Sequence, residues 1–331
     1  MQKLILAPMA TLSHEALRLT IERNAPNACD EFYTEMIQAT SCLAGGQYES
    51  FYLRTAPDVN RLVWQLTCGK AEPLADCASL VAGLGGIGVD INMGCCAPEI
   101  FKQGAGIAWM LKPVEETSRM LGNVKKNIGN MRLSVKMRLG DEDYTQEGLL
   151  DFCRMLADQG VCQIVLHPRT RKAKFKRSPD YRQAEALKEF LQHNYGETIK
   201  LIVNGDIKDA ASLCAVQKLV PDADGFMIGR AAVQKPWLFT DLKAALNGET
   251  TEKRQINLQK VALDFLDDLK TSQPYDFWIS RAQRFFAYYG NNFMFAHYLQ
   301  TQVFNTKTLD ELTAAFLAYF EKQPDEKYKM V

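Results

Sequence analysis

The sequence of 331 residues lacks any apolar run of the ~20 residues that a membrane-spanning helix needs. It also lacks a signal-peptide pattern at its N-terminus, an internal repeat and a low-complexity segment. Its nine cysteines show none of the paired spacings of a zinc site, so we predict no metal site. An odd number of scattered cysteines indicates reduced thiols, and we expect a cytoplasmic protein that is not associated with a membrane.

The composition is that of an ordinary globular protein, with 47% apolar and 24% charged residues. The length is sufficient for one α/β barrel of about 250 residues and a smaller domain. The formal net charge is zero, which neither requires nor excludes nucleic acid as a partner. Such a partner would have to be bound by local charged patches.

Short apolar runs separated by helical patterns predict eight strands. These runs lie at 4–7, 31–34, 61–66, 88–92, 133–138, 162–167, 200–205 and 224–230. Eight such units are typical of an α/β fold of the closed (β/α)8, or TIM, barrel type. From about residue 237 the strand signals stop and amphipathic helices rich in Phe, Tyr and Leu follow. We therefore predict a barrel domain over 1–236 and an all-helical C-terminal domain over 237–331.

Chemically capable side chains gather at the carboxyl ends of the predicted strands, which meet at one mouth of a barrel, where active sites are built. Taken singly, each has a plain structural interpretation: Cys95 could be a buried filler, Lys136 an interior ion pair and His167 a core histidine. The other residues at these strand ends are Pro8, Met9, Gln65, Asn92, Arg138, Asn204, Gly205, Gly229 and Arg230.

The last two strand ends suggest a phosphate site. Asn204-Gly205 and Gly229-Arg230 offer backbone amides and a cation at the place where barrels hold phosphates. Together with Gln65, Lys136 and His167 they suit flavin mononucleotide (FMN). Gln65 and Asn204 could bond its ring or tail, and Lys136 could lie near the ring edge that becomes negative on reduction.

The sequence resembles the tRNA-dihydrouridine synthases over roughly residues 3 to 236. The motifs that carry the resemblance are Leu6-Ala7-Pro8-Met9, Gln65, Asp90-Ile91-Asn92-Met93-Gly94-Cys95, Gly104-Ala105-Gly106, Val135-Lys136-Met137-Arg138, Val165-Leu166-His167-Pro168-Arg169-Thr170-Arg171, Asn204-Gly205-Asp206 and Ile228-Gly229-Arg230. The helical tail, with Arg281-Ala282-Gln283-Arg284-Phe285-Phe286, is similar to that family's RNA-binding domain. Its character is closest to the C-type bacterial branch.

The resemblance implies that NADPH reduces FMN, and that hydride then passes from the flavin to C6 of a uridine in the tRNA D-loop, with U16 as a candidate. It also implies that Cys95 donates the proton to C5 and that Asn92 lies beside the uracil ring. A thiol with an unperturbed pKa of ~8.5 is mostly protonated at neutral pH, which suits this role. The FMN contacts implied by the resemblance are Pro8, Met9, Ala10, Gln65, Lys136, His167, Asn204, Gly205, Asp206, Gly229 and Arg230.

Four positions depart from the family pattern. Cys96 replaces the usual proline, although the spacing from Asn92 to Cys95 and on to Gly104 is intact, so we assign the acid to Cys95. Ala10-Thr11 stands where acidic and glycine residues are common. Pro168 replaces a glycine and removes a backbone donor. The aromatic after the Arg-Thr-Arg loop is represented by Phe175 and Tyr181.

The segment from Arg169 to Arg177 holds six Lys or Arg residues in nine positions. Such a run is often only a solvated loop, but beside a flavin that must meet a uracil base we favour a clamp for tRNA phosphates. The target base would have to be unstacked, at a cost of a few kcal/mol. The predicted substrate-binding residues are Asn92, Arg138, Arg169, Arg171, Lys172, Lys174, Arg281 and Arg284.

For this function we expect a monomer without an obligate protein partner. Two alternatives stay open at this point. One is an FMN-dependent dehydrogenase of a free pyrimidine such as dihydroorotate, which would have no use for the basic loop or the helical tail. The other is a non-catalytic, flavin-containing tRNA-binding protein, which would not need Cys95 and Lys136.

Overall fold

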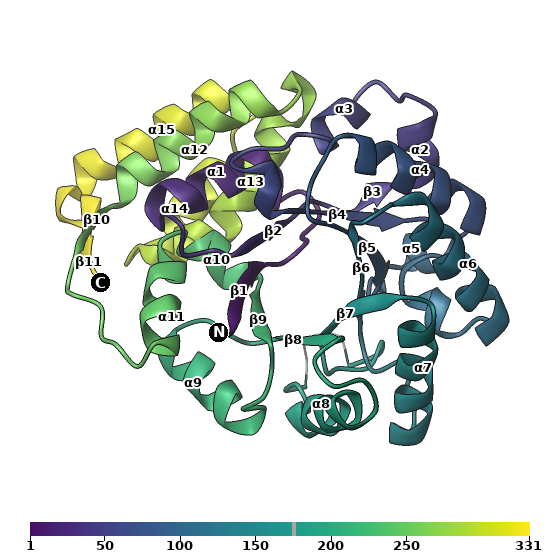
Figure 1. Cartoon of the computed structure of the whole chain (residues 1–331). Helices are drawn as coiled ribbons and strands as arrows, with labels where there is room; N and C mark the ends of the chain where they lie inside the picture. Colours follow the sequence, from purple (N-terminus) through teal and green to yellow (C-terminus); the bar gives the residue numbers. More distant parts are fainter. Residues whose placement is uncertain (174–176) are drawn as a thin grey trace.

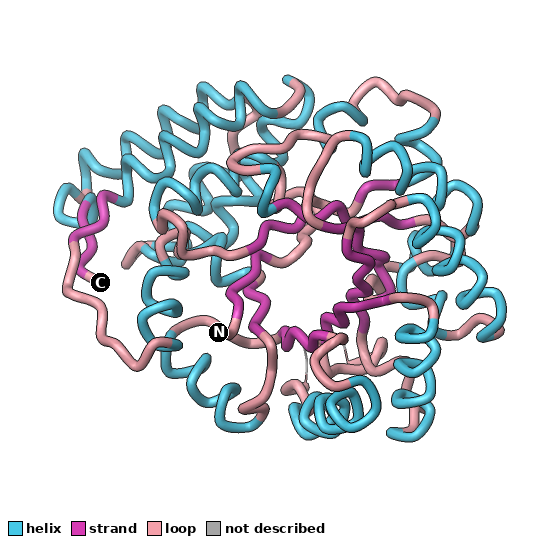
Figure 2. The backbone as a smooth tube through the Cα atoms, in the orientation of Figure 1, coloured by secondary structure: helices cyan, strands magenta, loops and turns pink. Residues whose placement is uncertain are grey.

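The computed structural model describes residues 1–173 and 177–331, and its centre is a closed ring of eight parallel strands (Figures 1 and 2). Strand β2 pairs with both β1 and β4, and β1 pairs with β9, so the sheet has no open edge. The predicted (β/α)8 barrel is confirmed. Its strands are β1 (Lys3–Leu6), β2 (Glu31–Tyr33), β4 (Leu62–Thr67), β5 (Gly88–Met93), β6 (Arg132–Met137), β7 (Val161–Leu166), β8 (Lys200–Asn204) and β9 (Gly225–Ile228), and β3 (Ile37–Gln38) adds a short pairing to the end of β4.

Helices follow the strands and form an outer ring around the barrel (Figure 1). Helix α7 begins directly after Thr145, whose side chain accepts a hydrogen bond from the Gly148 N–H at 3.0 Å. The ring contains α1 (Glu15–Asn24), α2 (Ala39–Leu43), α3 (Glu49–Tyr52), α4 (Ala71–Gly83), α5 (Pro98–Lys102), α6 (Val114–Asn127), α7 (Gln146–Asp158), α8 (Tyr181–Tyr195), α9 (Ala210–Leu219), α10 (Arg230–Gln234) and α11 (Leu238–Leu246), with 3-10 turns at Val59–Arg61 and Gly106–Met110.

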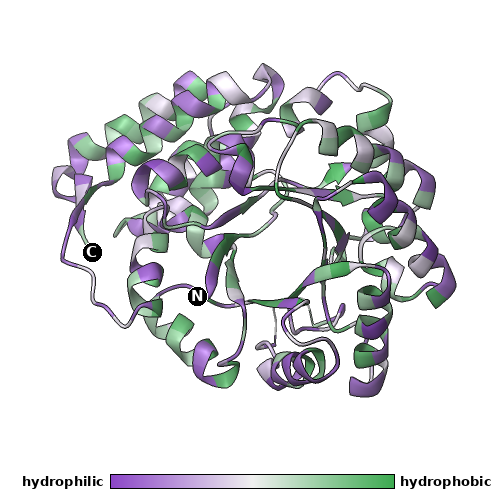
Figure 3. Cartoon of the chain, in the orientation of Figure 1, coloured by the Kyte–Doolittle hydropathy of each residue, from purple (hydrophilic) through white to green (hydrophobic). Residues whose placement is uncertain are grey.

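The strands bury both of their faces, as expected when helices cover a parallel sheet. Figure 3 shows the hydropathy of the residues along these strands and helices. Outward side chains join the large core beneath the helices. Inward side chains alternate with them and form a smaller core inside the barrel, which includes Ile5, Tyr33, Val63, Val165 and Ile202. This period of two determines which residues of each strand can face the interior.

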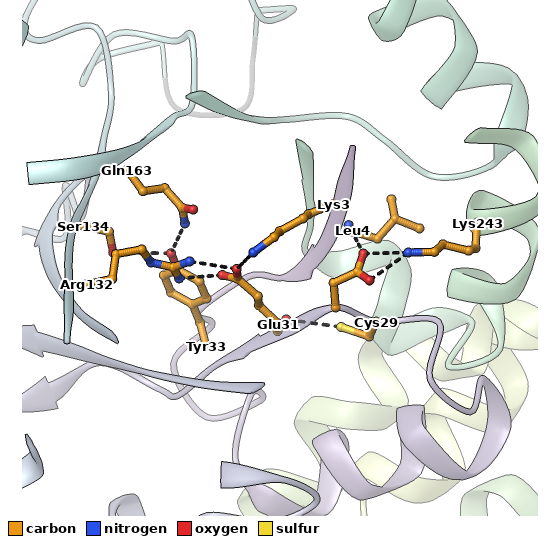
Figure 4. A network of polar contacts seen from close by, with 10 residues as sticks. Lys3, Leu4, Cys29, Glu31, Tyr33, Arg132, Ser134, Gln163 and Lys243 are labelled. Atoms are coloured by element: carbon orange, nitrogen blue, oxygen red, sulfur yellow. Dashed lines mark hydrogen bonds and ion pairs between the residues drawn. The ribbon is translucent and has the colours of Figure 1, made fainter. Parts of the chain in front are cut away.

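The amino-terminal end of the barrel interior contains a polar network (Figure 4). Glu31 accepts hydrogen bonds from Lys3 at 2.7 Å and from two nitrogens of Arg132 at 2.8 and 2.6 Å. Above it, Gln163 donates to the Tyr33 hydroxyl at 3.0 Å. Groups at this end of a TIM barrel usually stabilise the fold, so we place the site at the opposite end.

The C-terminal part packs against one side of the barrel, where α12 contacts α1 and α13 contacts α10 (Figure 1). Its helices are α12 (Leu258–Ser272), α13 (Trp278–Tyr289), α14 (Ala296–Phe304) and α15 (Leu309–Lys322), with 3-10 turns at Tyr275–Phe277, Gly290–Asn292 and Pro324–Lys327. Over the described residues, no helix is long and apolar enough to cross a membrane.

Two details of this part differ from the sequence prediction. It is not entirely helical, because β10 (Gln255–Asn257) and β11 (Tyr328–Met330) form an antiparallel pair. Strands of three residues give no readable alternation in a sequence. The boundary at 236 also falls early, because α11 packs on α9 and β1 as the last helix of the barrel.

Candidate active site

A cavity of about 700 Å³ opens at the carboxyl ends of the barrel strands, within the size range of ligand and cofactor sites. Fifteen of the residues predicted from the sequence line it, although they come from strands distributed over the whole chain. They are Pro8, Met9, Ala10, Gln65, Asn92, Cys95, Lys136, Arg138, His167, Arg169, Asn204, Gly205, Asp206, Gly229 and Arg230.

A chain of buried hydrogen bonds runs along the wall of this cavity. Gln65, Asp90 and Ser134 are register partners on adjacent strands. Asp90 accepts from Gln65 Nε2 at 2.8 Å and from Ser134 Oγ at 2.7 Å. Gln65 Oε1 in turn accepts from Asn92 Nδ2 at 2.9 Å.

The carboxylate at the start of this chain determines the direction of the amides. Asp90, when ionised, can only accept, so Gln65 must direct its NH2 group toward Asp90 and its oxygen toward Asn92. Asn92 must then direct its own oxygen outward, where it accepts from the backbone N–H groups of Gly94 at 3.2 Å and Cys95 at 2.9 Å. One buried carboxylate therefore orients two amides that line the site. Burial raises the pKa of Asp90 to about 6.

The backbone of Cys95 is held at both of its polar groups. Its N–H donates to Asn92, and its carbonyl accepts from the Ile107 N–H at 3.0 Å. Gly106 makes this approach possible: its φ is +62°, and a Cβ atom there would lie 2.5 Å from the Cys95 carbonyl oxygen. Burial raises the pKa of the Cys95 thiol, so it keeps its proton at neutral pH. Cys96 also lines the cavity.

Lys136 lies next to Asn92 because the two residues are register partners on β5 and β6. Burial, and then the charge of Arg138, lower the pKa of Lys136 to about 8. The Asp90 carboxylate opposes this shift. At neutral pH the ammonium group therefore stays charged in a cavity that also contains a protonated thiol.

His167 and Arg169 form a different kind of pair. A guanidinium group has only donors, so Arg169 Nη1 donates to His167 Nε2 at 3.0 Å and the ring proton resides on Nδ1. Burial and the neighbouring cations lower the pKa of His167 well below its usual range. The ring is therefore neutral and presents an N–H donor at Nδ1.

Arg169 was predicted to bind tRNA phosphates, and its position does not fit that role. Its side chain is 3% exposed and forms a bidentate ion pair with Asp206, at 2.6 and 3.2 Å. The guanidinium group is thus neutralised inside the wall of the cavity. Arg169 instead orients His167 and fixes Asp206 at the point where the chain leaves β8.

The last two strands form the part of the cavity that was predicted to hold a phosphate. Gly205 has a φ of +133°, and its carbonyl accepts from the Tyr181 hydroxyl at 2.6 Å. Asn204 Nδ2 donates to the Met227 carbonyl at 2.8 Å, so this amide braces β8 against β9. The Arg230 side chain is half exposed at the rim, 3.9 Å from Asp206.

These residues fit FMN on four grounds. The cavity is large enough for a tricyclic ring, and its wall includes amides of fixed direction and a neutral histidine. A Cβ atom at Gly205 would lie 3.0 Å from Pro179 and 3.2 Å from His167, and its φ of +133° disfavours any other residue, so glycine suits this surface. Arg230 and Lys208 supply positive charge at the end where a phosphate would lie.

Several residues predicted to bind RNA do not line the cavity. Arg171 pairs with Asp141 at 2.5 Å, and Lys172 pairs with Glu142 at 3.1 Å. The two acidic partners lie on the loop after β6. Lys174 and Phe175 lie outside the described residues. Arg284 on α13 stacks over the Tyr288 ring at 5.5 Å.

Arg281 is buried rather than exposed to a docking RNA. Its side chain is 3% exposed and donates to Glu35 at 2.7 Å, between α13 and the barrel. This position does not favour the predicted contact with tRNA, because burial in an ion pair removes the guanidinium group from the surface.

The sequence also missed residues that line the cavity, among them Met36, Lys208, Gln234 and Tyr288. Tyr288 is the most informative of these, because it belongs to the C-terminal helices and brings an aromatic ring to the barrel mouth. One signal could have found it: Tyr288 lies four positions after Arg284, on the same face of α13.

Comparisons with known proteins agree with this geometry. The family model for dihydrouridine synthase (Dus) matches residues 5–316. The chain belongs to the dihydrouridine synthase family. A probable tRNA-dihydrouridine synthase of Staphylococcus aureus is 28% identical over 328 residues, which cover 98% of this chain and 95% of the relative. The resemblance seen in the sequence is thus confirmed, and this member of the dihydrouridine synthase family is an oxidoreductase.

Two further relatives carry the same name. A probable tRNA-dihydrouridine synthase of Helicobacter pylori is 26% identical and covers 80% of this chain and 76% of the relative. One of Mycobacterium tuberculosis is 28% identical and covers 74% of this chain and 62% of the relative. The similarity to dihydrouridine synthases therefore includes the barrel and, in the Staphylococcus aureus protein, the C-terminal helices as well.

Proposed function

We propose that this chain reduces a uridine in the D-loop of tRNA to 5,6-dihydrouridine, with FMN as its bound cofactor and NADPH as the reductant. The observation that carries the proposal is the placement of a protonated thiol (Cys95), a lysine ammonium group (Lys136) and two oriented amides (Gln65 and Asn92) around one cavity of a dihydrouridine synthase family member. Family membership favours this proposal over a free-pyrimidine dehydrogenase. The oriented catalytic groups favour it over a non-catalytic RNA-binding protein.

The cofactor would be held by the loop after β1 and by the ends of β4 and β6 to β9. FMN, when bound, supplies the hydride that adds to C6 of the uracil ring. Neutral His167 can donate to an acceptor on the cofactor, and Arg230 can balance the phosphate charge. Lys136 can stabilise the negative charge that accumulates on the flavin ring edge. The residues proposed to contact FMN are Pro8, Met9, Ala10, Gln65, Lys136, His167, Asn204, Gly205, Asp206, Gly229 and Arg230.

Cys95 is the proposed acid for C5. Its Sγ–H bond breaks as the proton moves to C5, and the electrons of that bond stay on sulfur as a thiolate. Lys136 and Arg138 lie close enough for their charges to lower the pKa of Cys95, so they stabilise the thiolate when it forms. Solvent can return the proton after product release. Asn92 would hold the base while its oxygen keeps the Cys95 backbone in place.

The tRNA would dock across the mouth of the barrel. The proposed contacts are Arg138 inside the rim, Arg171 and Lys172 on the neighbouring loops, and Arg284 with Tyr288 on α13. Base–aromatic stacking is sequence-tolerant, so Tyr288 suits a flipped nucleotide or its neighbour. The resemblance to the C-type branch makes U16 the candidate target. NADPH and tRNA are both cytoplasmic, so we propose that location for the enzyme as well.

The test compares two adjacent thiols. Cys95→Ala should keep the yellow flavin but lose dihydrouridine formation by about 10²–10⁴-fold, the usual contribution of a general acid. Cys96→Ala is the matched control, because that thiol also lines the cavity. It should retain most activity, since the proposed acid, Cys95, is still present. Product is measured on unmodified tRNA with NADPH. A fully active Cys95→Ala variant together with an inactive Cys96→Ala variant would move the assignment by one residue.

A further inference from the structure

The loop after β1 has a strained backbone at Thr11. Its φ is +65°, a left-handed conformation that glycine adopts freely and that a β-branched residue rarely adopts. The two residues before it, Met9 and Ala10, line the cavity. A conformation of this kind persists only when surrounding contacts hold it in place.

Some of these contacts come from the loop itself. Ser13 lies at the end of this loop, because α1 begins only after His14. Its hydroxyl accepts from the Met9 N–H at 2.8 Å, and the Met9 carbonyl accepts from the Leu12 and Ser13 N–H groups, both at 3.0 Å. These bonds close a turn around Ala10 and Thr11, but they leave the Thr11 N–H to another partner.

That partner is Glu35, which follows β2. Its Oε1 accepts from the Thr11 N–H at 2.5 Å, and its Oε2 accepts from Arg281 Nη1 at 2.7 Å. Both side chains of this ion pair are almost fully buried, at 4% and 3% exposure. A buried charge left without its partner is strongly destabilising, so each group needs the other.

Arg281 approaches Glu35 from α13, outside the barrel. Its guanidinium group packs over the rings of Tyr52 and Phe277, at 5.6 and 5.2 Å, and contacts the Tyr52 hydroxyl at 3.4 Å. A planar guanidinium group between two aromatic rings has little freedom to turn. The rings of α3 and of the turn before α13 therefore restrain Arg281. Arg281 holds Glu35, and Glu35 holds Thr11.

We propose that Glu35 and Arg281 are positioning residues: their ion pair fixes the strained turn at Thr11 and thereby the Pro8–Ala10 segment that contacts FMN. This inference rests on the proposed function, because it assumes that the cavity binds FMN. It also gives the C-terminal helices a second role besides contact with RNA, since one of their arginines shapes the cofactor site. Ala10-Thr11 departs from the family pattern, and the Glu35–Arg281 ion pair would hold the turn that these two residues form.

The experiment measures FMN affinity and thermal stability on the full-length protein after removal and re-addition of FMN. Glu35→Gln removes the charge and directs an amide NH2 at one of its two donors. Arg281→Lys keeps the charge but loses the planar fork. We expect each to weaken FMN binding by about tenfold or more, a change that corresponds to the loss of one strong contact. Flavin fluorescence reports the binding without any need for turnover.

A rescue separates this role from general destabilisation. Thr11→Gly removes the strain, so the loop should no longer need its clamp. The double variant Thr11→Gly with Glu35→Gln should therefore bind FMN within about threefold of Thr11→Gly alone. Asp268→Asn is the matched control, because it breaks another ion pair between α12 and α1, with Arg23 at 2.9 Å, that does not touch the loop. It should leave FMN affinity unchanged.

The outcomes are distinct. Wild-type FMN affinity in Glu35→Gln and Arg281→Lys would overturn the inference and leave the proposed function standing. Weak binding that Thr11→Gly does not restore would also overturn it, because the pair would then act through overall stability. Absence of FMN binding by the wild-type protein would overturn both this inference and the proposed cofactor.

Discussion

Asp90→Ala is the perturbation that tests the hydrogen-bond chain in the cavity wall. Asp90 is fully buried and accepts from Gln65 at 2.8 Å and from Ser134 at 2.7 Å. Its removal leaves two buried donors without these acceptors. Gln65 is then free to turn its amide, and Asn92 loses the constraint that directs its oxygen toward the Cys95 N–H.

The expected fall in the free energy of unfolding follows from these two donors. Each buried, unsatisfied polar group costs about 1–3 kcal/mol, so the free energy of unfolding should fall by about 2–6 kcal/mol. Burial raises the pKa of Asp90 to about 6, which shows that the charge itself is unfavourable there. Its removal relieves that cost, so we expect the lower half of the range, about 2–4 kcal/mol.

Urea unfolding and FMN affinity together check this prediction. Asp90→Asn should be mild, because the new amide oxygen can accept from Gln65 while its NH2 group turns to the Ser134 hydroxyl. Ser134→Ala should also be mild, since it removes one donor and leaves the carboxylate bonded to Gln65. An Asp90→Ala variant within about 0.5 kcal/mol of the wild type, with unchanged FMN affinity, would refute the reasoning.

Further predictions concern the acid–base and turn residues. Because burial lowers the pKa of Lys136 to about 8, kcat/KM should fall as the pH rises through about 8 and the ammonium group loses its proton. Lys136→Arg should move this limb to higher pH, whereas an identical profile in both proteins would contradict the assignment. Gly106→Ala should reduce kcat by at least about tenfold with little change in FMN affinity, because the new Cβ meets the Cys95 carbonyl at 2.5 Å. Gly129→Ala is its control, since Gly129 has a similar φ of +54° but no atom within 4 Å of the Cβ position, and an equal loss in both variants would contradict the steric argument.

The sequence was sufficient to predict the barrel and most of the cavity wall. Polar residues at the ends of apolar strands must meet at one mouth once the sheet closes, which places Gln65, Asn92, Lys136 and His167 together. The direction of their hydrogen bonds could not be predicted from the sequence, because it depends on how the strands are aligned with one another. Asp90 orients Gln65 only because the two residues face each other across β4 and β5.

The basic residues show why the rest could not be predicted. Arg169 and Arg281 read as RNA-binding residues, but each is itself buried and pairs with a carboxylate, 37 and 246 positions away in the sequence. A charge far along the chain gives no local sign of its partner. Tyr288 was missed for a related reason, since the contact between α13 and the barrel depends on how the C-terminal helices pack.

The central claim is that Cys95 and a bound flavin act together on a uridine of tRNA. The most direct measurement maps dihydrouridine at single-nucleotide resolution in total tRNA from a strain lacking this gene, and again after it is restored. We predict that a D-loop position loses dihydrouridine, and that the wild-type gene but not the Cys95→Ala form restores it. An unchanged map in the deletion strain, or full restoration by Cys95→Ala, would contradict the account.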